Sequence, residues 1–233
     1  MIPVRDHNPS GIAPRVTQAL IALNLGVFAY SELILHGHAR ALFIFTYSFI
    51  PLRLHVGQGY QTLITAMFLH GGWLHLGGNM LFLHIFGDNI EARLGRARYI
   101  GFYLVCGLAA ALTQYLHDPF ARYPVLGASG AIAGVLGAYL RLYPRARVDV
   151  YTFVIFWRTI PLPTWGVIGV WIGFQLYAGL SDPSLNDGVA YWEHIGGFAA
   201  GFLLSLLVKR PAPEIPNPET FRASAIPAVP RHP

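Results

Sequence analysis

Three short polar motifs interrupt long apolar stretches of the chain. A Gly-x-Ser-Gly motif at 127–130 opens one stretch, and His194 lies inside another. A third motif runs from His70 through His75 to Asn79. A serine hydroxyl becomes an effective nucleophile when a base accepts its proton, and histidine is the commonest base. Ionisable groups in apolar segments of membrane length are costly, so these residues predict hydrolytic chemistry at membrane depth.

Ser129 is the candidate nucleophile and His194 the candidate general base. The nucleophile elbow of α/β-hydrolases has a glycine two residues after the serine, whereas this chain has Ala131 there. No acidic residue is well placed to complete a triad. The aspartates of the segment 181–188 fall in or beside a polar loop, and Glu193 points about 100° away from His194 on a helix. We therefore predict a Ser–His dyad.

The oxyanion formed in acyl transfer needs hydrogen-bond donors. His75 and Asn79 are four residues apart, which makes them neighbours on one helix face, and both can donate. The backbone N–H of Ser129, at the start of a helix, is a third candidate donor. His70, His75 and Asn79 lack the spacing and the acidic residue of a zinc motif. We therefore predict no metal site, and nothing in the chain indicates a cofactor.

Small residues explain how the serine and the histidine could meet. Gly130 and Gly134 are four residues apart, and Gly197 and Gly201 share a helix face with His194. Such small residues allow helix backbones to approach closely within a membrane. Helix packing alone is the plainer interpretation of these glycines.

Composition indicates an integral membrane protein. Of the 233 residues 54% are hydrophobic and only 12% are charged, whereas soluble domains carry roughly 25% charged residues. A helical span needs about 20 mainly apolar residues. Six segments come close to that length: 17–35, 74–90, 99–115, 126–143, 164–180 and 189–208. We therefore predict an all-α, polytopic bundle of six transmembrane helices.

The remaining segments divide the chain further. Residues 1–15 are predicted to form an N-terminal segment, 16–208 the membrane domain, and 209–233 a disordered tail rich in proline. The segments 42–54 and 148–160 are predicted to be amphipathic or re-entrant pieces at the membrane interface. The first of them belongs to the long connection 36–73, which its aromatic residues predict to be folded against the membrane surface.

Basic residues are divided unevenly between the two sets of connecting loops. Thirteen of the 16 Lys and Arg residues fall in one set and three in the other. Because cytoplasmic loops are enriched in these residues, both termini are predicted to be cytosolic. This orientation places Ser129 and His194 near the outer face, at about the depth of His75 and Asn79. The net charge of +5 is spread between apolar segments, so no nucleic-acid partner is predicted.

These motifs resemble those of the rhomboid family of intramembrane serine proteases. The resemblance covers about residues 15 to 208. The matching residues are His70, His75, Asn79, Glu91, Arg93, Gly127, Ser129, Gly130, His194, Gly197 and Gly201. The resemblance implies a six-helix core without a seventh helix, as in many bacterial members, in the inner membrane of a bacterium. It also implies that Ser129 attacks, that His194 is the base, and that His75, Asn79 and the Ser129 N–H hold the oxyanion.

Two further expectations follow from the resemblance. Glu91 and Arg93 would be structural residues that tie down the cytosolic end of the second predicted helix. Many members carry an aromatic residue one turn after the serine, packed against the catalytic histidine, and this chain has Ala133 there. Either another side chain supports His194, or the orientation of its ring is looser.

The predicted activity is cleavage of single-pass membrane proteins near the outer face of the lipid bilayer. Substrates would arrive laterally beside the helix 164–180, and the polar loop 181–188 would cover the site. The side chains expected along that route are Trp165, Val167, Trp171 and Phe174. Two alternatives stay open, a catalytically idle rhomboid-like protein that binds membrane proteins and a small transporter. The presence of both Ser129 and His194 argues against the first. The gathering of the polar residues at one depth argues against the second.

Overall fold

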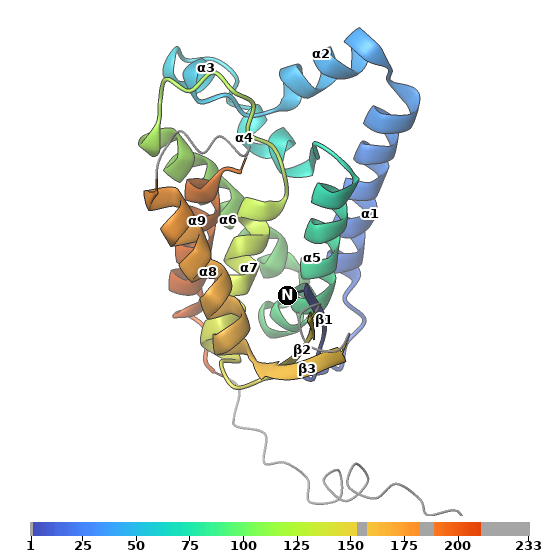
Figure 1. Ribbon diagram of the computed structural model, residues 1–233, viewed down its shortest axis with the longest axis vertical. Helices are drawn as coiled ribbons and strands as arrows, with labels where there is room; N and C mark the ends of the chain where they lie inside the picture. Colours follow the sequence, from blue (N-terminus) through green and yellow to red (C-terminus); the bar gives the residue numbers. More distant parts are fainter. Residues whose placement is uncertain (1, 153–157, 182–188, 211–233) are drawn as a thin grey trace, which may run out of the picture.

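Figure 1 shows the computed structural model, which describes residues 2–152, 158–181 and 189–210. Long helices run between an end that carries a small sheet and an end that carries short helices. The long helices are α1 (Arg15–Ala29), α5 (Trp73–Leu94), α6 (Arg96–His117), α7 (Ser129–Leu142), α8 (Thr164–Leu180) and α9 (Tyr191–Ser205). The short ones are the π-helical turn η1 (Tyr30–Ile34), α2 (Gly37–Tyr47), α3 (Pro51–His55), α4 (Thr62–Thr65) and η2 (Ala66–Phe68).

Each of the six apolar segments contains a helix, but the helices differ in length and polarity. The stretches Arg15–Ile34 and Arg96–His117 are long and apolar enough to cross a bilayer. The helices Ser129–Leu142 and Thr164–Leu180 are apolar but shorter. The chain is therefore mostly helical as predicted, while the number of membrane crossings remains a prediction.

The prediction of an all-α fold is wrong at one end of the bundle. The segment 148–160, predicted as an amphipathic or re-entrant piece, belongs to the strands β2 (Arg147–Thr152) and β3 (Arg158–Pro163). These strands pair antiparallel, and β1 (Ile2–Asp6) pairs antiparallel with the other edge of β2. The reason is period-two burial, since Val148, Val150 and Thr152 are buried between more accessible neighbours.

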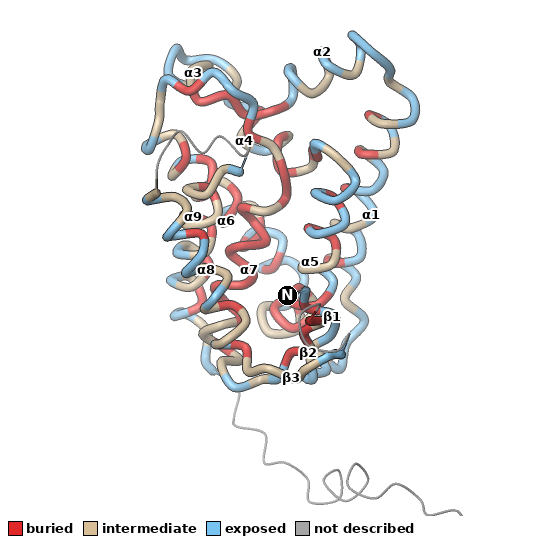
Figure 2. The backbone as a smooth tube through the Cα atoms, viewed as in Figure 1, coloured by how far each residue is buried: buried red, intermediate tan, exposed pale blue. Residues whose placement is uncertain are grey.

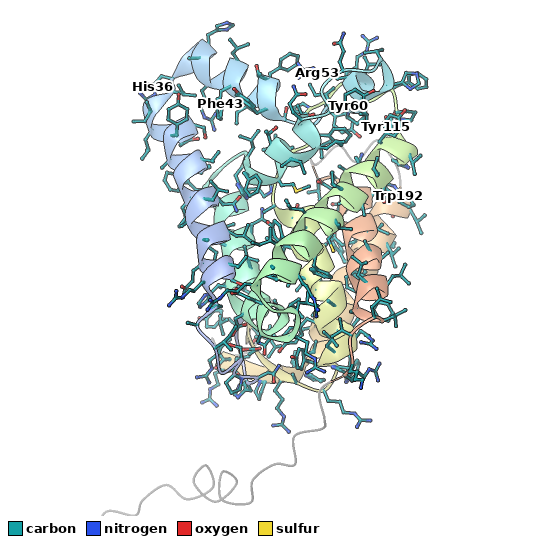
Figure 3. The ribbon with its side chains drawn as sticks, turned by 180° about the vertical axis from the view of Figure 1, so that it is seen from behind. His36, Phe43, Arg53, Tyr60, Tyr115 and Trp192 are labelled. Atoms are coloured by element: carbon teal, nitrogen blue, oxygen red, sulfur yellow. The ribbon has the colours of Figure 1, made fainter. Side chains whose placement is uncertain are left out.

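The connection 36–73 is folded, as its aromatic content predicts. It is helical on both sides of a break at 48–50, where Phe49 is buried and pairs with Val125 in an isolated β-bridge. Pro51 occupies the first turn of α3, where its missing N–H costs nothing. Arg53 lies over the ring of Phe45, with its guanidinium carbon 4.0 Å from the ring centre. Figure 3 shows Phe43, Arg53 and Tyr60 at the end of the bundle opposite the sheet.

Burial is greatest in α7, which lies at the centre of the bundle (Figure 2). Tyr139 on α7 is fully buried against Phe86 of α5, with ring centres 5.0 Å apart. The outer helices carry exposed apolar side chains instead, among them Leu25 on α1 and Phe174 on α8. A soluble protein rarely exposes so much apolar surface, so the outer faces suit contact with lipid.

Candidate active site

Glycines hold α7 and α9 at close range. A Cβ added to Gly197 would collide with the carbonyl oxygen of Gly130, and one added to Gly201 would collide with that of Gly134. Both positions on α9 therefore admit only a hydrogen atom. The close packing brings the first turn of α7 beside the first turn of α9, which carries His194.

Ser129 and His194 are hydrogen-bonded to each other. The hydroxyl oxygen of Ser129 lies 2.8 Å from Nε2 of His194. The helix was predicted to begin near residue 126, but it begins at Ser129, and the residue before it, Ala128, supplies no side-chain cap. The N–H groups in the first turn of an α-helix lack partners within the helix. The Ser129 N–H is therefore placed where a developing negative charge could be bound.

Gly127 keeps space open beside the serine. Its φ of +136° lies in a region that L-residues rarely adopt. A Cβ at this position would lie 2.8 Å from His75 Nε2 and 3.4 Å from Ser129 Oγ. The glycine therefore allows the histidine ring and the serine hydroxyl to approach the same small volume.

Hydrogen bonding around His75 fixes which of its ring nitrogens carries the proton. Its Nδ1 accepts a hydrogen bond from the backbone N–H of Gly71, at 3.4 Å. A neutral histidine that accepts at one nitrogen donates at the other. Nε2, which points toward Gly127, is therefore the donor. His70 is buried with its ring 5.1 Å from that of His75 in an edge-on arrangement.

Asn79 has an unused donor. Its side chain is buried, and its amide nitrogen has no hydrogen-bond partner among the residues that the structure describes. Buried donors without a partner are uncommon, because they lose hydration without compensation. Asn79 and His75 share one face of α5 and line the same cavity as Ser129. They can therefore donate to an oxygen atom held in that cavity.

The cavity has a volume of about 890 Å³ and is bounded by five helices. Its lining includes His75, Asn79 and Phe82 of α5, Gln114 of α6, Ser129, Ala133 and Leu136 of α7, Trp171 of α8, and His194 of α9. The volume is large enough for several residues of an extended peptide. Beyond Ser181, the loop predicted to cover the site lies outside the described residues.

Two side chains on α8 contact His194, and one of them, Gln175, was not among the site residues predicted from the sequence. Oε1 of Gln175 lies 2.7 Å from His194 Nδ1. The ring of Trp171, predicted only to line a substrate route, has its centre 5.7 Å from that of His194. Another side chain thus supports His194 where Ala133 cannot. Gln175 could have been singled out from the sequence because it is an amide residue in an otherwise apolar segment.

The loop before Ser129 is attached to the folded connection 36–73. The N–H of Gly127 donates to the carbonyl of Ala66 at 2.9 Å. Two further backbone hydrogen bonds join Phe49 and Val125, at 2.9 and 2.7 Å. The connection therefore holds the backbone that leads into the serine.

Glu91 and Arg93 lie at the opposite end of the bundle. The carboxylate of Glu91 accepts hydrogen bonds from the N–H groups of Val16 and Thr17, at 3.0 and 2.8 Å. It also accepts one from the Thr17 hydroxyl at 2.9 Å, so it caps α1. Arg93 donates to the carbonyl of Lys209, just beyond α9. Both residues link helices far from Ser129.

A second polar cluster lies beside the sheet. The hydroxyl of Tyr139 donates to Oδ2 of Asp6 at 2.6 Å, and the amide of Asn89 donates to the same oxygen at 2.9 Å. Burial raises the pKa of Asp6 to about 6, against the hydrogen bond from Tyr139 and with a smaller contribution from Asp88. Among the described residues, no three His, Cys, Asp or Glu side chains gather as metal ligands would.

Comparison with known proteins gives a consistent assignment. The family model named Rhomboid domain matches residues 57–211. Rhomboid protein 1, mitochondrial, of Saccharomyces cerevisiae is 28% identical over 82% of this chain and 53% of its own length. Rhomboid protease GluP of Bacillus subtilis is 32% identical over 67% of this chain and 28% of its own length.

Putative rhomboid protease YdcA of the same bacterium is 30% identical over 62% of this chain and 65% of its own length. The chain thus spans between about a quarter and two thirds of these three relatives, two of which are named as proteases. The match to the rhomboid domain covers well over half of the residues. The chain belongs to the rhomboid family.

Proposed function

We propose that this protein is an intramembrane serine endopeptidase with Ser129 as nucleophile and His194 as general base. The observation that carries the proposal is the 2.8 Å hydrogen bond between Ser129 Oγ and His194 Nε2 at the wall of a large cavity. The proteases among its relatives support it. The family to which the chain belongs is one of membrane proteins, in keeping with the apolar outer faces of α1 and α8.

The first half of the reaction uses both residues. As Ser129 Oγ attacks the carbonyl carbon of the scissile peptide bond, its proton passes to Nε2 of His194. The carbonyl oxygen becomes an oxyanion, which receives hydrogen bonds from the Ser129 N–H, His75 Nε2–H and the Asn79 amide. His194 then gives the proton to the departing amine, the C–N bond breaks, and an acyl-enzyme remains.

Water completes the cycle. His194 takes a proton from a water molecule as the water oxygen attacks the acyl carbon. Collapse of the second oxyanion breaks the bond to Ser129 Oγ, and the hydroxyl recovers its proton from His194. The new carboxyl terminus leaves, so the net reaction is hydrolysis of one peptide bond with no cofactor required.

The substrates we propose are single-pass membrane proteins that arrive between α5 and α8. The cavity reaches Phe82 on α5 and Trp171 on α8, which are partly buried and pack against the hydrophobic core. Trp165 and Phe174 of α8 are exposed, as lipid-facing side chains would be. A helical peptide bond is shielded by its own hydrogen bonds, so small or helix-weakening residues are expected at the cleavage site.

The proposed orientation follows the distribution of charge. The termini would be cytosolic, the sheet end would face the cytosol, and Ser129 would lie near the outer face of a bacterial inner membrane. The domain would comprise residues 16–208, with 1–15 as an N-terminal segment that includes β1. The predicted disordered tail at 209–233 lies outside the described residues from position 211 onward.

A fluorophosphonate probe and a membrane-protein substrate together test the proposal. The purified protein should be labelled and should cleave, and Ser129→Ala should lose both activities by at least about 10³-fold. Its melting temperature should not change, since only one oxygen atom is removed. Two results together would contradict the assignment. Ser129→Ala would cleave at the rate of the natural protein, and the natural protein would not be labelled.

A further inference from the structure

Gln175 is a buried amide on an otherwise apolar helix, and it faces the catalytic histidine. The segment Thr164–Leu180 holds no charged residue, and only 5% of the Gln175 surface is exposed. Burying an amide is unfavourable unless it forms hydrogen bonds. Its Oε1 lies 2.7 Å from Nδ1 of His194. Neither the sequence motifs nor the relatives' names assign this residue a role.

The chemistry of the pair determines the protonation of the ring. An amide oxygen can only accept, so His194 Nδ1 must carry the hydrogen. In the neutral ring Nε2 is then the nitrogen with a free lone pair, and it is the one 2.8 Å from Ser129 Oγ. The other tautomer would present an N–H to the serine and could not accept its proton.

Two contacts from α8 also restrict rotation of the ring. Gln175 Oε1 lies 2.7 Å from Nδ1, and the Trp171 ring, tilted by 40° to that of His194, has its centre 5.7 Å away. Glu193, the neighbour of His194 on α9, does not supply such a contact to the ring. Its carboxylate lies by Gly130 of α7, where a Cβ would come within 3.1 Å of Oε1.

We propose that Gln175 is a positioning residue that holds His194 in the tautomer and orientation needed to accept the serine proton. The inference rests on the proposed function of Ser129 and His194. The amide oxygen stabilises the doubly protonated ring as it forms, because a hydrogen bond from a charged donor is stronger than one from a neutral donor. It thereby takes the place that a carboxylate holds in a Ser–His–Asp triad, without placing a net charge in the apolar bundle.

The test compares two substitutions at this position in the full-length chain, with kcat, KM and melting temperature measured for each. Gln175→Leu keeps the approximate size and removes the acceptor. We expect its kcat to fall roughly 10- to 100-fold, the range for one hydrogen bond to a group that becomes charged. KM should change by less than about threefold, since no substrate contact is lost. Gln175→Glu, which keeps an oxygen acceptor, should retain kcat within about fivefold.

Tyr177→Leu is the matched control on α8, because Tyr177 is exposed and lies outside the cavity lining. It should leave kcat and KM unchanged. If Gln175→Leu does not yield folded protein, Gln175→Met serves in its place with the same expected fall in kcat. The rate of fluorophosphonate labelling should fall in parallel, since it reports activation of Ser129 without a peptide substrate.

Three results would overturn the inference. These are an unchanged kcat in Gln175→Leu or Gln175→Met, an equal loss in Gln175→Glu, or a change confined to KM or melting temperature. Ser129→Ala separates this failure from failure of the proposed function. If Ser129→Ala is inactive while Gln175→Leu is fully active, only the role of Gln175 is wrong. If Ser129→Ala still cleaves, the serine protease assignment itself is wrong.

Discussion

The carboxylates of Glu91 and Asp6 at the sheet end of the bundle accept hydrogen bonds from the protein, whereas the Asn79 amide at the other end faces a cavity. At the sheet end the carboxylate of Glu91 accepts three hydrogen bonds from Val16 and Thr17, and Asp6 accepts from Tyr139 and Asn89. At the far end the amide nitrogen of Asn79 has no partner among the described residues.

The apolar bundle therefore holds two kinds of polar group, those with hydrogen-bond partners in the protein and those that face the cavity. Polar groups with protein partners, here called saturated, gain those hydrogen bonds on folding and therefore stabilise the fold. Groups aimed at a cavity retain their donors for a ligand and cost stability until one binds. Substitutions at the two ends should therefore change different measurements, and α5 offers a direct comparison because it carries both Asn79 and Asn89.

The largest effect is expected from removal of a proposed oxyanion donor. Asn79→Ala should lower kcat by about 10²–10³-fold, equivalent to about 3–4 kcal/mol of transition-state stabilisation. Its melting temperature should not fall, because the amide donor has no partner to lose. Asn89→Ala should show the reverse, a lower melting temperature with kcat per folded molecule unchanged. A lower melting temperature and full activity in Asn79→Ala would remove the distinction between the two ends.

A smaller effect is expected at the contact between α7 and α9. Gly201→Ala forces a methyl group against the Gly134 backbone, and overpacking of this kind costs about 1–3 kcal/mol of unfolding free energy. Activity should fall as well, because the same contact sets the distance from Ser129 to His194. Gly173→Ala on α8 is the control, since nothing lies within 4 Å of a Cβ there. Equal behaviour of the two variants in denaturant unfolding would contradict the role of close packing.

Glu91→Gln tests the saturated end alone. The new amide keeps the shape but turns one acceptor into a donor that faces the N–H groups of Val16 and Thr17. We expect a loss of about 2 kcal/mol in unfolding free energy, with kcat unchanged. Glu32→Gln removes a partly exposed ion pair with Arg40 and should cost less than about 1 kcal/mol. A fall in kcat without a fall in stability would show that Glu91 acts on the site.

The smallest effect concerns the pH dependence of stability. Because burial raises the pKa of Asp6 to about 6, the folded protein holds this proton more tightly than the unfolded chain, whose value is 3.8. The contribution of Asp6 to stability is therefore greatest below about pH 4 and is lost as pH rises through about 6. Solvent screening at this partly exposed carboxyl limits the effect to less than about 1 kcal/mol.

The measurement is the difference in melting temperature between the natural sequence and Asp6→Asn at several pH values. The natural protein should lose stability relative to the variant between pH 4 and 6, and the difference should stay constant above pH 7. A difference that does not change with pH, or one of opposite sign, would show that Asp6 is not held in the protonated form by its surroundings.

The sequence could predict which residues meet but not everything that orients them. Ser129 and His194 lie on helices whose glycine spacing favours close approach, and helical periodicity put His75 and Asn79 on one face. Residue spacing within a single helix determines which residues share a face, so these features can be predicted from the sequence. The partner of Gln175 depends on how α8 is rotated against α9, and no spacing along one helix contains that information.

The sheet escaped prediction for a similar reason. The strand β1 pairs with β2 across more than a hundred residues of chain, and a non-local pairing leaves no local signal. In the segment 148–160 the alternation of Val148 and Val150 was present, but the charges of Asp149 and Arg158 also fitted an amphipathic piece at the membrane interface. The observed pairing of β2 with β3 uses the alternation.

The shortness of α7 has a consequence for the supply of water. Its 14 residues extend over about 21 Å, whereas the hydrocarbon layer of a bilayer is about 30 Å thick. In the proposed orientation, with the sheet end at the cytosolic boundary, the first residue of α7 would lie below the outer boundary of the hydrocarbon. Water that entered the cavity lined by Ser129 would then reach the serine from that side of the bundle. The proposed deacylation step would then draw its water from that cavity without any separation of the helices.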